Sequence, residues 1–183
     1  MRGPVKRWGG ARAGAGRPKR GAIASEPHKR RPAHVATQPV HVIARVVRAA
    51  GALHDRHARR AIERALHRSL GQTTFRIVHL RIASVRIELV VEASDRIALA
   101  RGMQGFQVAA AKHLNRLRGR RGCVFADRYR ARPLQTLAAV RGVVGAAVWR
   151  GPTSSEVPDG VAERWIAIAR PETRLLERGP PPR

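Results

Sequence analysis

Two β-branched runs with only two residues between them constrain the fold of this chain most. The segments TTFRIVHLRI and VRIELVVEA occupy residues 73–82 and 85–93, separated by Ala83 and Ser84. Runs this close in sequence favour an antiparallel hairpin, and side chains alternate between the two faces of a strand. We expect the core face of the second run to hold Val85, Ile87, Leu89 and Val91. The other face should be open and polar, with Arg86, Glu88, Val90 and Glu92.

The segments around this hairpin predict two more strands and three helices. Residues 39–48 are β-branched and roughly alternating, as in a strand, and residues 54–70 place apolar side chains at helical spacing. A long amphipathic helix should follow the hairpin, with Ser94 or Asp95 as its N-cap. We expect the last two elements to be a short strand and a helix, at residues 123–125 and 137–149.

This order of elements is typical of an α+β fold with helices packed on one face of the sheet. It is close to the split βαβ arrangement found in several nucleic-acid-binding proteins. We divide the chain into a disordered basic arm at residues 1–38, a folded domain at 39–150 and a mostly disordered tail at 151–183. The arm has too few large apolar residues to build a core, and the tail ends in a proline-rich run.

The positive charge of the chain points to a polyanionic partner. The formal net charge is +25, and +16 of it lies between residues 39 and 150, in the part expected to fold. A domain with this charge repels itself unless a polyanion or counterions screen it, and nucleic acid is the commonest such polyanion. The abundance of Arg over Lys also fits a biased base composition of the gene, so composition alone leaves both explanations open.

Three further features limit the class of protein. Cys123 is the only cysteine, which excludes a disulfide framework and a cysteine-based metal site. The segment MRGPVKRWGG lacks the apolar stretch of a secretory signal, and no uncharged apolar run approaches the roughly 20 residues of a membrane span. We therefore expect a cytoplasmic protein, associated with the nucleoid, that does not enter the membrane.

Several segments together resemble one protein family. They are GGARAGAGRPK in the arm, PVHV at the start of the first strand, FRIVHLRIASVRIELVVEA, RGMQGF and KHLNRLRGRRGCVFADRYRARPL. From about residue 9 to residue 150 their order and spacing are similar to those of the small tyrosine transposases of bacterial insertion sequences and their repeat-associated relatives, in the His-hydrophobe-His (HUH) superfamily. The resemblance implies a ferredoxin-like antiparallel sheet, and a reaction that cleaves and rejoins single-stranded DNA beside a hairpin.

The resemblance also implies a mechanism whose chemical residues are replaced in this chain. In the family a tyrosine attacks a phosphodiester, and a divalent metal such as Mg or Mn, held by two histidines of one strand, orients the phosphate. The two histidine positions correspond to Arg86 and Glu88, the tyrosine to Ala146, and a further polar residue at the metal site to Arg150. Arginine offers no lone pair to a metal, and alanine offers no nucleophile. We therefore expect a DNA-binding protein without cleavage activity or metal cofactor, in which Arg86 pairs with Glu88 or meets a phosphate directly.

The basic residues of the matching segments are the expected phosphate contacts. They are Arg116, Arg118, Arg120, Arg121, Arg128, Arg130 and Arg132. The expected partner is DNA, single-stranded or in a hairpin, and the sequence leaves open whether the protein forms a homodimer.

Three alternatives stay open at this point. One is an active single-strand DNA endonuclease or transposase, in which Tyr129 is the nucleophile and Glu88 with His79 forms a rebuilt metal site. A tyrosine at that position is more often structural, and a lone histidine in a strand is more often packed than a ligand. The second alternative is a basic RNA-binding protein that shares the fold, and the third is the product of a decaying gene with no selected role.

Overall fold

The structure, a computed structural model of the chain, describes residues 34–67, 72–145, 148–149, 165–169 and 172. Most of the expected arm and most of the expected tail lie outside these residues. Within the described part of the chain, no helix is long and apolar enough to cross a membrane.

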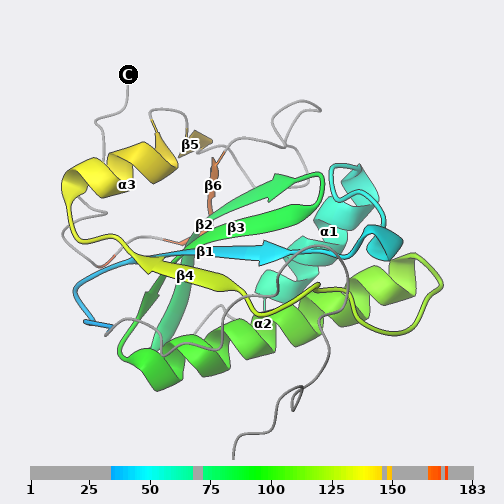
Figure 1. Cartoon of the computed structure of the whole chain (residues 1–183), viewed down its shortest axis with the longest axis horizontal. Helices are drawn as coiled ribbons and strands as arrows, with labels where there is room; N and C mark the ends of the chain where they lie inside the picture. Colours follow the sequence, from blue (N-terminus) through cyan, green and yellow to red (C-terminus); the bar gives the residue numbers. More distant parts are fainter. Residues whose placement is uncertain (1–33, 68–71, 146–147, 150–164, 170–171, 173–183) are drawn as a thin grey trace, which may run out of the picture.

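A mixed six-stranded sheet forms the centre of the domain (Figure 1). Four of its strands, in the order β4-β1-β3-β2, pair antiparallel throughout, which is the ferredoxin-like arrangement and confirms the expected α+β class. Two short strands, β6 and β5, continue the sheet beyond β2, and β5 runs parallel to β6. In chain order the strands are β1 (Val40–Arg45), β2 (Phe75–Ala83), β3 (Arg86–Ala93), β4 (Arg130–Pro133), β5 (Val148–Trp149) and β6 (Trp165–Ala167).

The β2–β3 hairpin turns one residue later than the sequence predicted. Ala83 pairs with Arg86, so the two turn residues are Ser84 and Val85 rather than Ala83 and Ser84. The side chain of Val85 is therefore 51% exposed instead of lying in the core. A register shift between Ile77 and His79 marks a bulge in β2.

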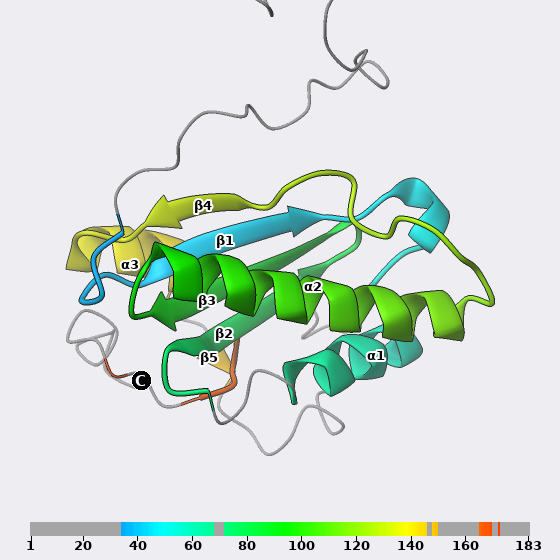
Figure 2. The same ribbon diagram turned by 90° about the horizontal axis from the view of Figure 1, so that it is seen from below.

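Two helices cover one side of the sheet, which we call the first face (Figure 2). They are α1 (Arg56–Leu66) and α2 (Arg96–Leu117), and they lie side by side. Each begins at an aspartate whose carboxylate accepts two backbone N–H groups of the first turn, Asp55 for α1 and Asp95 for α2. Their apolar side chains pack with those of the strands into the main core, which includes Leu53, Ile62, Phe75, Ile82, Leu89, Met103, Phe106 and Leu114.

The third helix, α3 (Leu137–Val144), packs at one end of the opposite side, which we call the second face (Figure 1). The Thr136 side chain caps its first turn, and Gly145, at φ 63°, ends it five residues before the predicted end. A smaller apolar cluster joins this helix to the sheet through Val78, Leu134, Val90, Val140, Val144 and Trp165. The expectation that helices pack on one face of the sheet holds for α1 and α2. It does not hold for α3, which packs on the second face and buries Val90, so that this face is partly covered rather than open.

The fourth strand of the sheet lies later in the sequence than predicted. Residues 123–125 form no strand, and Phe125 makes only a single bridge to Val46. The edge strand β4 is instead the basic segment Arg130–Pro133, whose side chains alternate between exposed and half-buried. A proline is tolerated there because an edge strand leaves one row of N–H groups unpaired.

Candidate functional site

The second face of the sheet carries most of the polar side chains of the strands. Partner residues in neighbouring strands point to the same face, and Val42 and Leu89, which pair, both belong to the core of the first face. The intervening positions therefore point to the second face. Arginines at these positions come from four strands, and they are Arg45, Arg76, Arg81, Arg86, Arg130 and Arg132. The carboxylates among them are Glu88 and Glu92.

Glu88 lies at the centre of a charged group on this face, which we call the Glu88 cluster. Its Oε1 accepts hydrogen bonds from Arg81 Nη2 (2.7 Å) and Arg86 Nε (2.6 Å), and its Oε2 accepts one from His41 Nε2 (3.3 Å). Three strands supply these groups: His41 comes from β1, Arg81 from β2, and Arg86 and Glu88 from β3. The expected ion pair between Arg86 and Glu88 is thus present, as part of a larger cluster.

The carboxylate of Glu88 stays ionised because of these partners. The residue is 3% exposed, and burial by itself would raise its pKa. The hydrogen bonds from His41, Arg81 and Arg86 outweigh burial and lower the pKa of Glu88 from 4.5 to about 2. At neutral pH the second face therefore contains a fixed negative charge held by two guanidinium groups and an imidazole.

Trp165 of β6 lies beside the Glu88 cluster and connects it to α3. The guanidinium carbon of Arg81 lies 5.4 Å from the centre of a Trp165 ring, and the His41 ring meets the indole edge-on with centroids 5.8 Å apart. The indole Nε1 donates to the carbonyl of Val143 in α3 (2.7 Å). Because Trp165 is 3% exposed, it limits the orientations open to Arg81 and His41.

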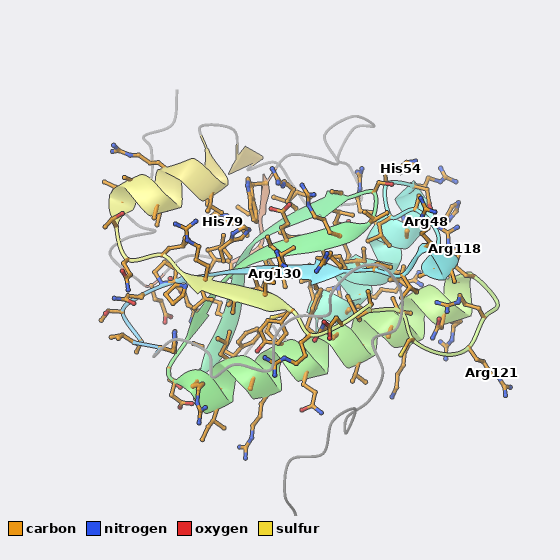
Figure 3. The ribbon with its side chains drawn as sticks, in the orientation of Figure 1. Arg48, His54, His79, Arg118, Arg121 and Arg130 are labelled. Atoms are coloured by element: carbon orange, nitrogen blue, oxygen red, sulfur yellow. The ribbon has the colours of Figure 1, made fainter. Side chains whose placement is uncertain are left out.

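The cluster does not fit the metal implied by the family resemblance. Arg86 cannot coordinate a cation, and two guanidinium groups already bond to one oxygen of Glu88. His79 shares the second face with Glu88 but is opposite Val90, one row away, on the side of the sheet toward α3 (Figure 3). Among the described residues, no three His, Cys, Asp or Glu side chains come together to hold a metal.

Tyr129 and the residues of the rebuilt metal site lie on opposite sides of the sheet. Tyr129 is 6% exposed and belongs to the main core of the first face. Glu88 and His79 point to the second face, so the structure does not bring these three residues together. Ala146 and Arg150, which correspond to the family's nucleophile and to a further polar position, lie outside the described residues.

The seven expected phosphate contacts fall into separate regions. Arg130 and Arg132 are exposed on the second face, and Arg128 is exposed just before β4. The other four lie where α2 ends, at the opposite end of the molecule from α3, as the labelled Arg118 and Arg121 show in Figure 3. These four arginines, which we call the α2 group, are Arg116, Arg118, Arg120 and Arg121.

Two members of the α2 group hold the fold together. Arg118 Nη2 donates to Asp55 Oδ2 (2.5 Å) and to the carbonyl of Ala52 (2.9 Å), which ties the end of α2 to the start of α1. Arg120 Nη2 donates to the carbonyl of Cys123 (3.0 Å) across the following loop.

Sequence reasoning missed Arg81 and His41 as partners of Glu88. A hairpin pairs residues at equal distances from its turn, so a turn at Ala83 and Ser84 places Glu88 opposite His79, whereas the observed turn places it opposite Arg81. Placing the turn at Ser84 and Val85 would have identified Arg81 as the residue opposite Glu88. His41 is 47 residues away from Glu88 and had no local signal, because its position depends on the pairing of β1 with β3.

Comparisons with known proteins gave one structural match. No family model and no curated protein matches the sequence. A solved structure described as a REP-associated tyrosine transposase bound to a REP hairpin aligns with a TM-score of 0.47 and 11% sequence identity, over 65% of this chain and 68% of that chain. Similarity at this level does not establish a family, and the ferredoxin-like arrangement rests on the strand order and pairing described above.

Proposed function

We propose that this protein binds DNA, single-stranded or in a hairpin, through the second face of its sheet and does not cut it. The observation that carries the proposal is the concentration of six arginines from four strands on one face, where the same strands contribute two carboxylates, Glu88 and Glu92, and the Glu172 carboxylate pairs with Arg76. Both strand carboxylates are buried and occupied: Glu88 by its cluster, and Glu92 by the backbone N–H of Glu172.

The exposure of these arginines supports phosphate binding. Arg86, Arg130 and Arg132 are exposed, while the helices α1 and α2 cover the other face. A basic sheet surface of this kind can follow a flexible phosphate backbone, and each phosphate that is neutralised releases counterions. The net charge of +25 adds a long-range attraction for any polyanion.

The proposed lack of cleavage is supported by the chemistry of the same face. Strand transfer needs a nucleophile and an electrophilic activator close together. Arg86 and Glu88 form an ion pair instead of a metal site, and the Tyr129 side chain is in the core behind the sheet. The proposal therefore assigns binding to the arginines and no chemical step to the cluster.

The test combines binding and covalent chemistry in one experiment. Purified protein is incubated with end-labelled hairpin DNA with and without Mn²⁺ and analysed on native gels at several salt concentrations, and on denaturing gels. We expect a salt-dependent shift and no covalent adduct. An adduct would overturn the lack of cleavage, and tighter binding of an RNA of equal length would favour the RNA-binding alternative.

Paired substitutions locate the binding surface. Arg130→Gln with Arg132→Gln removes two charges from the second face, and Arg60→Gln with Arg64→Gln removes two exposed charges from α1 behind the sheet. The first pair should weaken binding. It should also lower the slope of log affinity against log salt by about 1.4, because each single-strand phosphate contact contributes roughly 0.7 to that slope. Equal effects of the two pairs would show that binding depends on net charge rather than on this face.

A further inference from the structure

The Glu88 cluster has the form of an anion-binding site that is already filled by a side chain of the protein. Two guanidinium groups and one imidazole converge on the two oxygens of a single carboxylate. The N–H groups of arginine match carboxylate and phosphate oxygens alike, because both anions present oxygens at similar spacing. A phosphate group placed where the Glu88 carboxylate lies would meet the same three donors.

The cluster has more donor capacity than its carboxylate uses. Nε of Arg81 is buried and has no hydrogen-bond partner among the described residues. The side chains of Arg86 and Arg81 are 48% and 30% exposed, whereas that of Glu88 is 4% exposed. An anion from solution can therefore reach both guanidinium groups without opening the core of the sheet.

We propose that the Glu88 carboxylate occupies a phosphate-binding site formed by Arg81, Arg86 and His41, and that it limits how tightly the second face binds phosphate. The inference rests on the proposed function in one respect, that the phosphate belongs to a nucleic acid. The site itself would take any phosphate group, inorganic pyrophosphate included. Glu88 thus acts as a tethered competitor whose charge offsets the two arginines nearest to it.

This arrangement makes the arginines of the second face unequal. Arg86 donates to Glu88 at 2.6 Å, so part of its charge is neutralised within the protein. Arg132, opposite His41 on the edge strand β4, is exposed and is not among the hydrogen-bond partners of the Glu88 carboxylate, which are His41, Arg81 and Arg86. Arg132 should contribute more to phosphate binding than Arg86 as long as Glu88 is ionised.

The direct test uses Glu88→Gln, which keeps the shape of the side chain and removes its charge. Binding of inorganic pyrophosphate is measured by titration calorimetry on the full chain, with Glu63→Gln as the control. Glu63 is on α1 behind the sheet, so its substitution changes the net charge equally but leaves the cluster intact. We expect about tenfold tighter pyrophosphate binding in Glu88→Gln than in the native protein, and less than twofold change in Glu63→Gln.

The result separates this inference from the proposed function. Tighter pyrophosphate binding in Glu88→Gln supports the inference even if hairpin DNA does not bind, which would refute only the proposed function. If the native protein binds hairpin DNA but Glu88→Gln binds pyrophosphate no more tightly than the native protein does, the inference is overturned and the proposed function stands.

A second comparison covers the case in which Glu88→Gln does not fold, as judged by circular dichroism. Arg86→Gln and Arg132→Gln are then compared in the native background with the same two ligands. A larger loss of affinity in Arg132→Gln supports the inference, because Arg86 is already neutralised by Glu88. An equal or larger loss in Arg86→Gln overturns it.

Discussion

The ring of Phe75 in β2 lies directly against Gly102 in α2. A Cβ atom at position 102 would overlap the Cγ and both Cδ atoms of that ring. Gly102 and Phe75 are both buried, so neither the helix nor the ring can move aside without disturbing the core. The glycine therefore sets the distance at which α2 packs on the sheet.

Gly102→Ala should destabilise the protein even though alanine favours helix. The intrinsic gain of about 1 kcal/mol is outweighed by overpacking, which typically costs about 1–3 kcal/mol and here involves an aromatic ring. Gly105 of the same helix provides the control, since a Cβ there meets no atom within 4 Å. Urea unfolding should show a loss of stability for Gly102→Ala and a gain of up to about 1 kcal/mol for Gly105→Ala. Equal effects of the two substitutions would refute the packing argument.

The carboxylate of Asp55 combines two functions that substitution can separate. Oδ1 caps α1 by accepting from the N–H groups of His57 (3.0 Å) and Ala58 (2.8 Å), while Oδ2 accepts from Arg118. Asp55→Asn keeps a capping oxygen and should cost less than about 1 kcal/mol, as for an exposed ion pair. Asp55→Ala also removes the cap and should cost about 1–2 kcal/mol more. Chemical denaturation of both variants checks this order, and equal costs in the two variants would show that the cap adds nothing beyond the ion pair.

Glu88 should make part of the stability depend on pH in the acidic range. Its pKa is about 2 in the folded protein and 4.5 when unperturbed, so its ionised form stabilises the fold above about pH 4.5. That contribution, on the order of 3 kcal/mol, is lost as the pH falls from about 4.5 towards 2. The difference in unfolding free energy between the native protein and Glu88→Gln should therefore shrink on going from pH 7 to pH 2.5. A difference that stays constant with pH would mean that the cluster does not hold Glu88 ionised.

Local sequence patterns predicted the elements that depend on local rules. The capping aspartate of α2, the apolar spacing of three and four along it and the alternation of β3 side chains between the two faces of the sheet all follow from side chains within a few residues, and all are present, although the polar side of β3, apart from Arg86, is buried rather than open. Errors arose where tertiary contacts decided the outcome. Arg130–Pro133 became the edge strand through pairing with β1, although residues 123–125 have the more apolar sequence.

The character of the second face could be predicted only in part. Arg86 and Glu88 were expected to share it and to pair, because they are two residues apart on one strand. The surroundings of Glu88 could not be read from its own strand, since its partners His41 and Arg81 come from β1 and β2 and both contact Trp165 of β6. The charged cluster is thus a product of strand registry and of β6, a strand late in the sequence that pairs with β2.

The arginines at the end of α2 should separate into structural residues and phosphate contacts that are additional to those of the second face. Arg118 and Arg120 donate to protein acceptors, whereas Arg116 and Arg121 are exposed. Arg118→Gln with Arg120→Gln should lower the midpoint of thermal unfolding and leave the salt slope of hairpin binding nearly unchanged. Arg116→Gln with Arg121→Gln should leave the midpoint unchanged and weaken binding, with a slope lower by up to about 1.4 if both contact phosphate. Because the two pairs remove the same charge from the same region, a slope that falls equally in both would show that this end of the molecule acts only through its net charge.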